Sequence, residues 1–141
     1  MLFTLVAGVA ATIQAAVNAT LGKRIGTLEA AAFQTVVAFV IFGGLTLALR
    51  HGFGGVGSAF REPPWLWLGG VMGVIIVFAL TFAPQRIGTV AFGGILIGGQ
   101  LATASIVDRF GLFGLDRIGF TWQRAVGLAL LAAGALLVLK R

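Results

Sequence analysis

The sequence predicts an all-α membrane protein that crosses the bilayer with five helices. Of its 141 residues, 59% are hydrophobic and only 10% are charged, and the mean hydropathy is +1.06. A soluble domain carries roughly a quarter of charged residues. The hydrophobic residues gather in five runs of about twenty, the length that a helix needs to cross the hydrocarbon core. These runs lack the period-two alternation of a membrane β-barrel, so we predict helices rather than strands.

The predicted helices follow the hydrophobic runs, and together they form one transmembrane domain over residues 1–141. Pro64 suits the first turn of the third helix, where the missing backbone donor costs nothing. Pro84 predicts the end of that helix, because a proline inside a helix removes a hydrogen bond. A turn over residues 84–88 then leads into the fourth helix. The expected spans are about residues 1–22, 28–49, 65–83, 88–107 and 122–139.

Composition narrows the classes of function. The net charge is +6, but the ten basic residues are scattered between apolar runs and form no patch, so we expect no nucleic-acid partner. They are placed instead as anchors at the membrane surface. Cysteine is absent, which excludes disulfides and cysteine metal sites. No nucleophile–base pair, metal cluster or phosphate loop is evident, so we predict neither an enzyme nor a bound cofactor.

The fourth run combines apolar residues with small and polar ones on one broad arc. Residues 89–107 carry no formal charge, Gly94 and Gly98 have the GxxxG spacing that lets another helix approach closely, and Gln100 adds an amide. A helix that faces only lipid has no reason to gather such residues on one side. We therefore expect this helix to face protein or a cavity. Gly69 and Gly73 in the third run are predicted to be packing contacts of the same kind.

Carboxamide side chains lie inside three of the predicted spans. Gln14 and Asn18 are four residues apart and project from one face of the first helix, Gln34 lies in the second, and Gln100 in the fourth. An amide in hydrocarbon costs several kcal/mol unless it finds a partner or water. Each amide alone is equally well explained by a hydrogen bond to a neighbouring helix. For the set at similar depth, we predict one polar cavity that binds substrate.

Charged side chains are missing from the middle of every span. Asp108, at the end of the fourth run, is the one candidate for coupling transport to a proton, although a solvated ion pair with the adjacent Arg109 explains it more simply.

The distribution of basic residues leaves the orientation undecided. With five spans, each side of the membrane receives five Lys or Arg residues, whereas orientation follows the difference between the two sides. We infer insertion in both orientations followed by antiparallel pairing. The alternative is that a partner subunit or one dominant helix determines a single orientation. One side holds Lys23, Arg24, Arg86, Lys140 and Arg141; the other holds Arg50, Arg61, Arg109, Arg117 and Arg124.

Short motifs occur along nearly the whole chain. They are Gln14-x-x-x-Asn18-Ala19-x-Leu21-Gly22, Trp67-Leu68-Gly69-Gly70-x-x-Gly73, Ala83-Pro84 to Gly88, Gly99-Gln100-Leu101, Asp108-x-Phe110-Gly111 and Arg124-x-x-Gly127 with Gly134. In their order and spacing, these motifs resemble the half-size, five-helix YdcZ-type inner-membrane exporters of the drug/metabolite transporter superfamily. The first helix lacks the glutamate that related four-helix multidrug exporters use for proton coupling, so that mechanism is not implied.

The resemblance implies a bacterial inner-membrane protein that pairs, with itself or with a paralogous half-size subunit, into a ten-helix dimer. It also implies export of a small metabolite or drug-like molecule. Alternating access by inverted repeats is the mechanism that we expect for such a dimer. A small dimeric channel lined by the amides, or a membrane subunit that transports nothing, are the competing interpretations.

Overall fold

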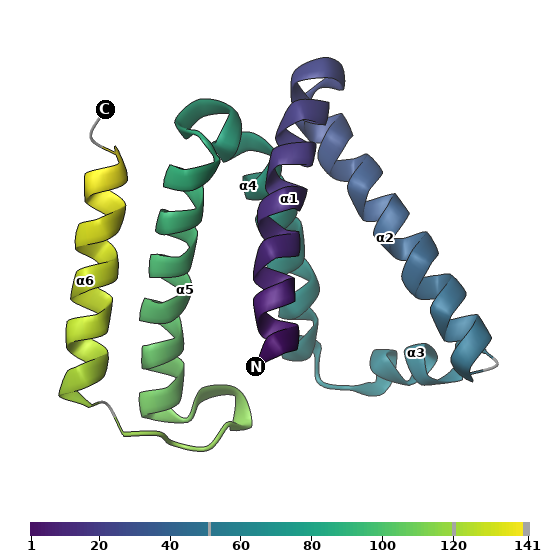
Figure 1. Cartoon of the computed structure of the whole chain (residues 1–141). Coiled ribbons are helices and arrows are strands. Elements are labelled where there is room, and N and C mark those ends of the chain that lie inside the picture. The colour runs from purple at the N-terminus through teal and green to yellow at the C-terminus, as the bar shows by residue number, and fades with distance from the viewer. Residues whose placement is uncertain (51, 120, 140–141) are drawn as a thin grey trace. The chain divides into compact units, whose positions relative to one another are not determined.

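The computed structural model describes residues 1–50, 52–119 and 121–139, and these residues form helices and connections without any strand (Figure 1). Each of the five predicted spans contains one long helix, which confirms the all-α fold. Four helices are long and apolar enough to cross a membrane, and α6 adds a fifth helix of 18 residues. The long helices are α1 (Leu2–Ile25), α2 (Thr27–Arg50), α4 (Leu68–Ile87), α5 (Thr89–Phe110) and α6 (Trp122–Leu139).

Short helical turns occupy the connections. The connection between α2 and α4 contains α3 (Gly54–Ser58) and two 3-10 turns, η1 (Ala59–Arg61) and η2 (Pro64–Trp67). A third 3-10 turn, η3 (Leu112–Gly114), follows α5. The chain divides into two compact units, Met1–Gln85 and Arg86–Arg141, and each is described by itself below.

In the first unit, α1 and α2 form an antiparallel hairpin around Gly26. This residue has φ of +104°, a conformation that residues with a side chain rarely adopt, so one glycine suffices to reverse the chain. Ala30 and Ala31 of α2 are buried, as are Ala15 and Ala19 of α1, and such small residues allow close helix packing. The two helices spread apart with distance from the turn (Figure 1).

The same unit brings α4 against the end of α1 at Gly22. A Cβ atom on Gly22 would lie 2.6 Å from Gln85 Nε2 and 3.0 Å from Thr81 Cγ2, so only glycine fits here without displacement. The Gln85 amide donates to the carbonyl of Thr81 and to the hydroxyl of Thr27. At Gly22, side chains of α4 therefore lie directly against the backbone of α1.

The predicted end of the third span at residue 83 is wrong, because α4 runs through the buried Pro84 to Ile87. Proline removes only its own backbone donor, and membrane helices tolerate this loss when neighbouring groups satisfy the freed carbonyl. Along the chain, Gly88 alone separates α4 from α5, and its φ of +81° replaces the predicted turn over residues 84–88.

In the second unit, α5 and α6 lie side by side (Figure 1). The fourth helix extends three residues beyond its predicted end at residue 107. It ends where Gly111 takes the left-handed conformation (φ +60°) and donates its N–H to the Val107 carbonyl, a common way to close a helix. The Ile118 N–H, in the connection that follows, donates to the Asp108 carbonyl at 2.8 Å. Since α6 starts at Trp122, its predicted bounds are confirmed.

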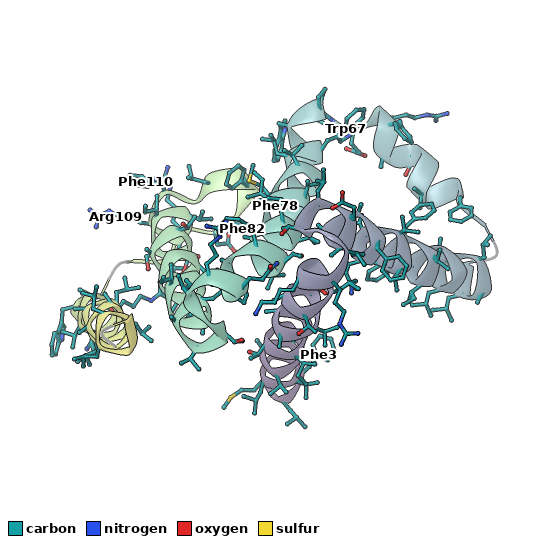
Figure 2. All side chains as sticks on the ribbon, turned by 90° about the horizontal axis from the view of Figure 1, so that it is seen from above. Phe3, Trp67, Phe78, Phe82, Arg109 and Phe110 are labelled. Atoms are coloured by element: carbon teal, nitrogen blue, oxygen red, sulfur yellow. The ribbon has the colours of Figure 1, made fainter. Side chains whose placement is uncertain are left out.

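The outer surfaces of the helices are apolar. Phe3 and Phe110, labelled in Figure 2, project from α1 and α5 with 85% and 57% of their surface exposed. A water-soluble protein rarely exposes so many large apolar side chains together, whereas a bilayer favours this arrangement. The buried hydrophobic residues are mostly alanine: Ala15, Ala19, Ala30, Ala31, Leu80, Ala91 and Phe92.

Candidate functional site

Asn18 is a fully buried amide without a hydrogen-bond partner. It is 1% exposed, and neither its oxygen nor its nitrogen makes a hydrogen bond with the part of the protein that the structure describes. Buried side-chain amides are nearly always hydrogen-bonded, because an unpaired amide keeps the full free-energy cost of leaving water. A residue that carries this cost is a candidate for contact with a ligand, a water molecule or a second subunit.

Gln14 projects from the same side of α1 as Asn18, one turn earlier, but its side chain is exposed. It lies at the centre of α1, about 1 Å from the helix midpoint at 1.5 Å per residue. The first helix therefore presents one exposed amide and one buried amide along a single face.

Gln34 lies at the same height of the α1–α2 hairpin as Asn18. Asn18 precedes Gly26 by eight residues and Gln34 follows it by eight, so both are about 12 Å along their helices from the turn. Gln34 is half-buried and stands one turn after Ala30, which packs in this hairpin. The hairpin thus carries an amide on each of its helices at one level.

Gln100 occupies the centre of α5, in the second unit, and is exposed. Three of the predicted packing glycines, one in α5 and two in α4, have no close neighbour among the described residues. A Cβ on Gly69, Gly73 or Gly98 would meet nothing within 4 Å among the described residues. The prediction that these three glycines and Gly94 pack against a helix therefore stays a prediction, now one about a second subunit.

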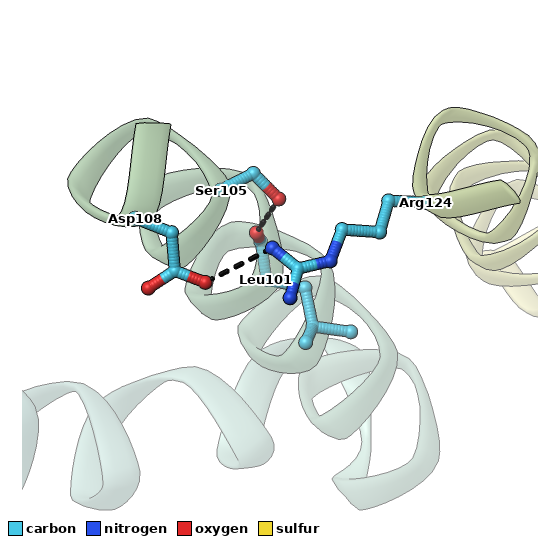
Figure 3. A network of polar contacts seen from close by, with 4 residues as sticks. All are labelled: Leu101, Ser105, Asp108 and Arg124. Carbon is cyan, nitrogen blue, oxygen red and sulfur yellow. Dashed lines mark hydrogen bonds and ion pairs between the residues drawn. The ribbon is translucent and has the colours of Figure 1, made fainter. Parts of the chain in front are cut away.

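Asp108 is ion-paired with Arg124 of α6 rather than with its sequence neighbour Arg109. Arg124 Nη1 donates to Asp108 Oδ2 at 3.1 Å (Figure 3), and the two side chains are 39% and 30% exposed. Adjacent residues on a helix point in different directions and do not face each other, which explains why Arg109 is not the partner. The sequence could have indicated Arg124 as the partner of Asp108, because Asp108 follows one predicted span and Arg124 lies at the start of the next, on the same predicted side of the membrane.

A pocket of about 290 Å³ extends inward from this ion pair between α5 and α6. Its walls come from four residues of α5 between Leu101 and Asp108 and four residues of α6 between Arg124 and Leu131. The Ser105 hydroxyl lines the pocket and donates to the Leu101 carbonyl at 2.8 Å (Figure 3). Apart from Ser105, Asp108 and Arg124, the lining is aliphatic or glycine.

Comparison with known proteins assigns the family. The profile of the family described as "Putative inner membrane exporter, YdcZ" matches residues 1–137, which is nearly the whole chain. The chain belongs to the YdcZ family of inner membrane exporters. This assignment confirms the resemblance seen in the motifs of the sequence. No curated protein and no solved structure matches the chain.

The polar groups in the described spans of this YdcZ-family chain include amides, the Asp108–Arg124 ion pair, and threonine and serine hydroxyls that donate to carbonyls of their own helices. Among the described residues, no group of three or more His, Cys, Asp or Glu side chains is placed to hold a metal ion. Motif reasoning selected the four amides and Asp108 as candidates, but it missed that Arg124 is the partner of Asp108, and it missed the pocket beside this pair. It also missed the contact of Gly22 with α4, because hydrophobic periodicity does not say which helices pack together.

Proposed function

We propose that this YdcZ-family protein is a secondary transporter of the bacterial inner membrane that exports a small metabolite or drug-like molecule by alternating access. The observation that carries this proposal is the match to an exporter family over residues 1–137. The apolar helices are in keeping with it, since they suit a multi-pass membrane protein.

The residues proposed to bind substrate are the amides Gln14, Asn18 and Gln34 of the first unit and Gln100 of the second. Asn18 supports this role most strongly, because its buried and unpaired amide is expensive for a purely structural residue. Amides bind neutral and charged polar groups alike through one donor and one acceptor function, which suits a carrier of small organic molecules. A bound substrate would supply the hydrogen bonds that Asn18 lacks within the chain.

The proposed active form is a dimer with antiparallel subunits, formed by two copies or with a paralogous half-size subunit. The equal number of basic residues on the two sides of the membrane supports insertion in both orientations. Gln14 and Gln100 also support pairing, since each is an exposed amide at the centre of a long apolar helix. Contact with a second subunit would remove these amides from lipid.

Asp108 is the proposed coupling residue. Its carboxylate is partly exposed and held by one hydrogen bond from Arg124. Protonation of the carboxylate would weaken this bond and free the guanidinium, which is a change that a carrier can link to conformation.

Counterflow in proteoliposomes tests the proposed function. Liposomes containing the purified protein are loaded with unlabelled amino acids, sugars or a quaternary ammonium compound, and uptake of the labelled compound is followed. A carrier gives saturable counterflow for at least one of these compounds. The double variant Gln14→Leu, Gln100→Leu should lose this counterflow while the protein stays inserted in the membrane. Flux that rises with the gradient without saturation indicates a channel instead, and a phenotype that survives both substitutions indicates a subunit that does not transport.

A further inference from the structure

The pocket between α5 and α6 combines an apolar interior with one acid and one base at a single end. Asp108 and Arg124 are joined by one hydrogen bond of 3.1 Å, between Nη1 and Oδ2. The described part of the chain thus leaves the second carboxylate oxygen and the remaining guanidinium N–H groups for other partners. Both side chains are partly exposed, and ion pairs in such surroundings are weak and easily exchanged.

From the charged end, the pocket runs about 10 Å along the helices, the length of seven residues at 1.5 Å each, from Asp108 to Leu101. Ala104 and Leu101 line it on α5, and Leu128 and Leu131 line it on α6. Gly127 belongs to the same wall, and a Cβ there would meet nothing within 4 Å among the described residues. The glycine therefore leaves space that a side chain would fill.

We infer that this pocket binds a small zwitterion with an apolar group, the chemistry of an aliphatic amino acid. Its ammonium group pairs with Asp108, its carboxylate pairs with Arg124, and its apolar group lies among the leucines of the pocket. Such a ligand exchanges one ion pair for two, so neither charge of the protein is left without a partner. A ligand with a single charge, positive or negative, pairs with only one of the two side chains, Asp108 or Arg124, and leaves the other side chain without its partner.

The volume limits the size of the ligand. The pocket has a volume of about 290 Å³. This is enough for an amino acid with a branched aliphatic side chain, and it lies at the lower limit of about 300 Å³ for ligand pockets. A phospholipid has the same zwitterionic chemistry when its headgroup is phosphatidylethanolamine, but its two acyl chains exceed this pocket several-fold.

None of the four amides proposed to bind substrate lines this pocket, so the pocket is a second site for the exported molecule. The inference rests on the proposed function only in taking the bound zwitterion to be that molecule. Binding is therefore measured apart from transport, with radiolabelled leucine and the purified full-length protein in nanodiscs of phosphatidylglycerol. Leucinamide, which carries only the ammonium, and N-acetyl-leucine, which carries only the carboxylate, serve as competitors. We expect saturable leucine binding that both competitors displace at least tenfold less well than unlabelled leucine.

Four variants locate the binding. Asp108→Asn and Arg124→Gln should each weaken leucine binding roughly tenfold or more, because each removes one charge-assisted hydrogen bond. Gly127→Leu should abolish binding by filling the pocket. Gly134→Leu is the matched control: it lies two turns further along α6, a Cβ there also meets nothing within 4 Å, and it does not line the pocket.

Three results would overturn the inference: leucine does not bind, either competitor matches leucine, or Gly127→Leu binds leucine like the parent protein. A further contrary result comes from nanodiscs that contain phosphatidylethanolamine. If this lipid competes with leucine, the pocket is a lipid headgroup site. If leucine binds as expected but none of the compounds tested shows counterflow, the pocket stands and the proposed transport function fails.

Discussion

Replacing Asn18 with alanine should stabilise the protein while it impairs transport. The native amide is 1% exposed with both polar atoms unpaired, a state that costs about 1–3 kcal/mol in proteins. Asn18→Ala removes this cost. The substitution also leaves a small cavity, which lowers the free energy of unfolding by less than about 1 kcal/mol at roughly 24 cal/mol per Å³. The net expected change is a gain of about 1 kcal/mol in the free energy of unfolding.

The assay is reversible unfolding by SDS in mixed micelles, followed by circular dichroism, with counterflow measured on the same variant. Thr81→Val is the control, because Thr81 is 0% exposed but its hydroxyl already donates to the Val77 carbonyl at 2.9 Å. This control should lose about 0.5–1.5 kcal/mol. If Asn18→Ala destabilises the protein as much as Thr81→Val does, the Asn18 amide has a partner in the folded state and the reasoning about its cost is refuted.

Three more predictions follow from packing, electrostatics and charge distribution. Gly22→Val should lower the free energy of unfolding by about 1–3 kcal/mol, because the added side chain overpacks against α4. Gly8→Val is the control in the same SDS titration and should change this free energy little, since a Cβ there meets nothing within 4 Å among the described residues. Equal effects of the two substitutions would exclude the close contact at Gly22. A double-mutant cycle of Asp108→Asn and Arg124→Gln should give a coupling energy of about 0.2–1 kcal/mol, and this energy should decrease in high salt. A larger coupling energy that does not depend on salt would contradict the partial exposure of the pair. Fusions of alkaline phosphatase and of green fluorescent protein to the C-terminus should both be active, because the proposed insertion in both orientations places the C-terminus on either side of the membrane; a single active reporter would eliminate dual insertion.

The positions of the helices could be predicted from the sequence because the length of an apolar run is a physical requirement of the bilayer. The residues at which the helices end were harder to predict from the sequence. Pro84 marks a helix end in most soluble contexts, yet α4 continues past it for three residues, and α5 outlasts its predicted end because Gly111 rather than Asp108 closes the helix.

The side chains of the candidate site could be identified by type but not by contact. A spacing of four residues places Gln14 and Asn18 on one face of α1, as expected, but no periodicity tells that one is exposed and the other buried and unpaired. The partner of Asp108 is likewise a matter of tertiary packing, since Arg124 reaches it from the next helix. Such contacts depend on which helices pack together. The apolar faces of these helices are too similar in sequence to predict which helix packs against which.

The central claim is that water reaches the partly or fully exposed amide positions inside the apolar helices, and the absence of cysteine from the chain allows a direct measurement of it. Single substitutions Gln14→Cys, Gln34→Cys and Gln100→Cys are treated in intact membranes with a small, water-soluble thiol reagent, with Ile75→Cys of α4 as the apolar control. The thiolate is the reactive form, and a thiol in hydrocarbon stays protonated and inert. We predict that all three positions are labelled much faster than position 75; labelling as slow as at position 75 would show that no aqueous path reaches these amides and would contradict the account.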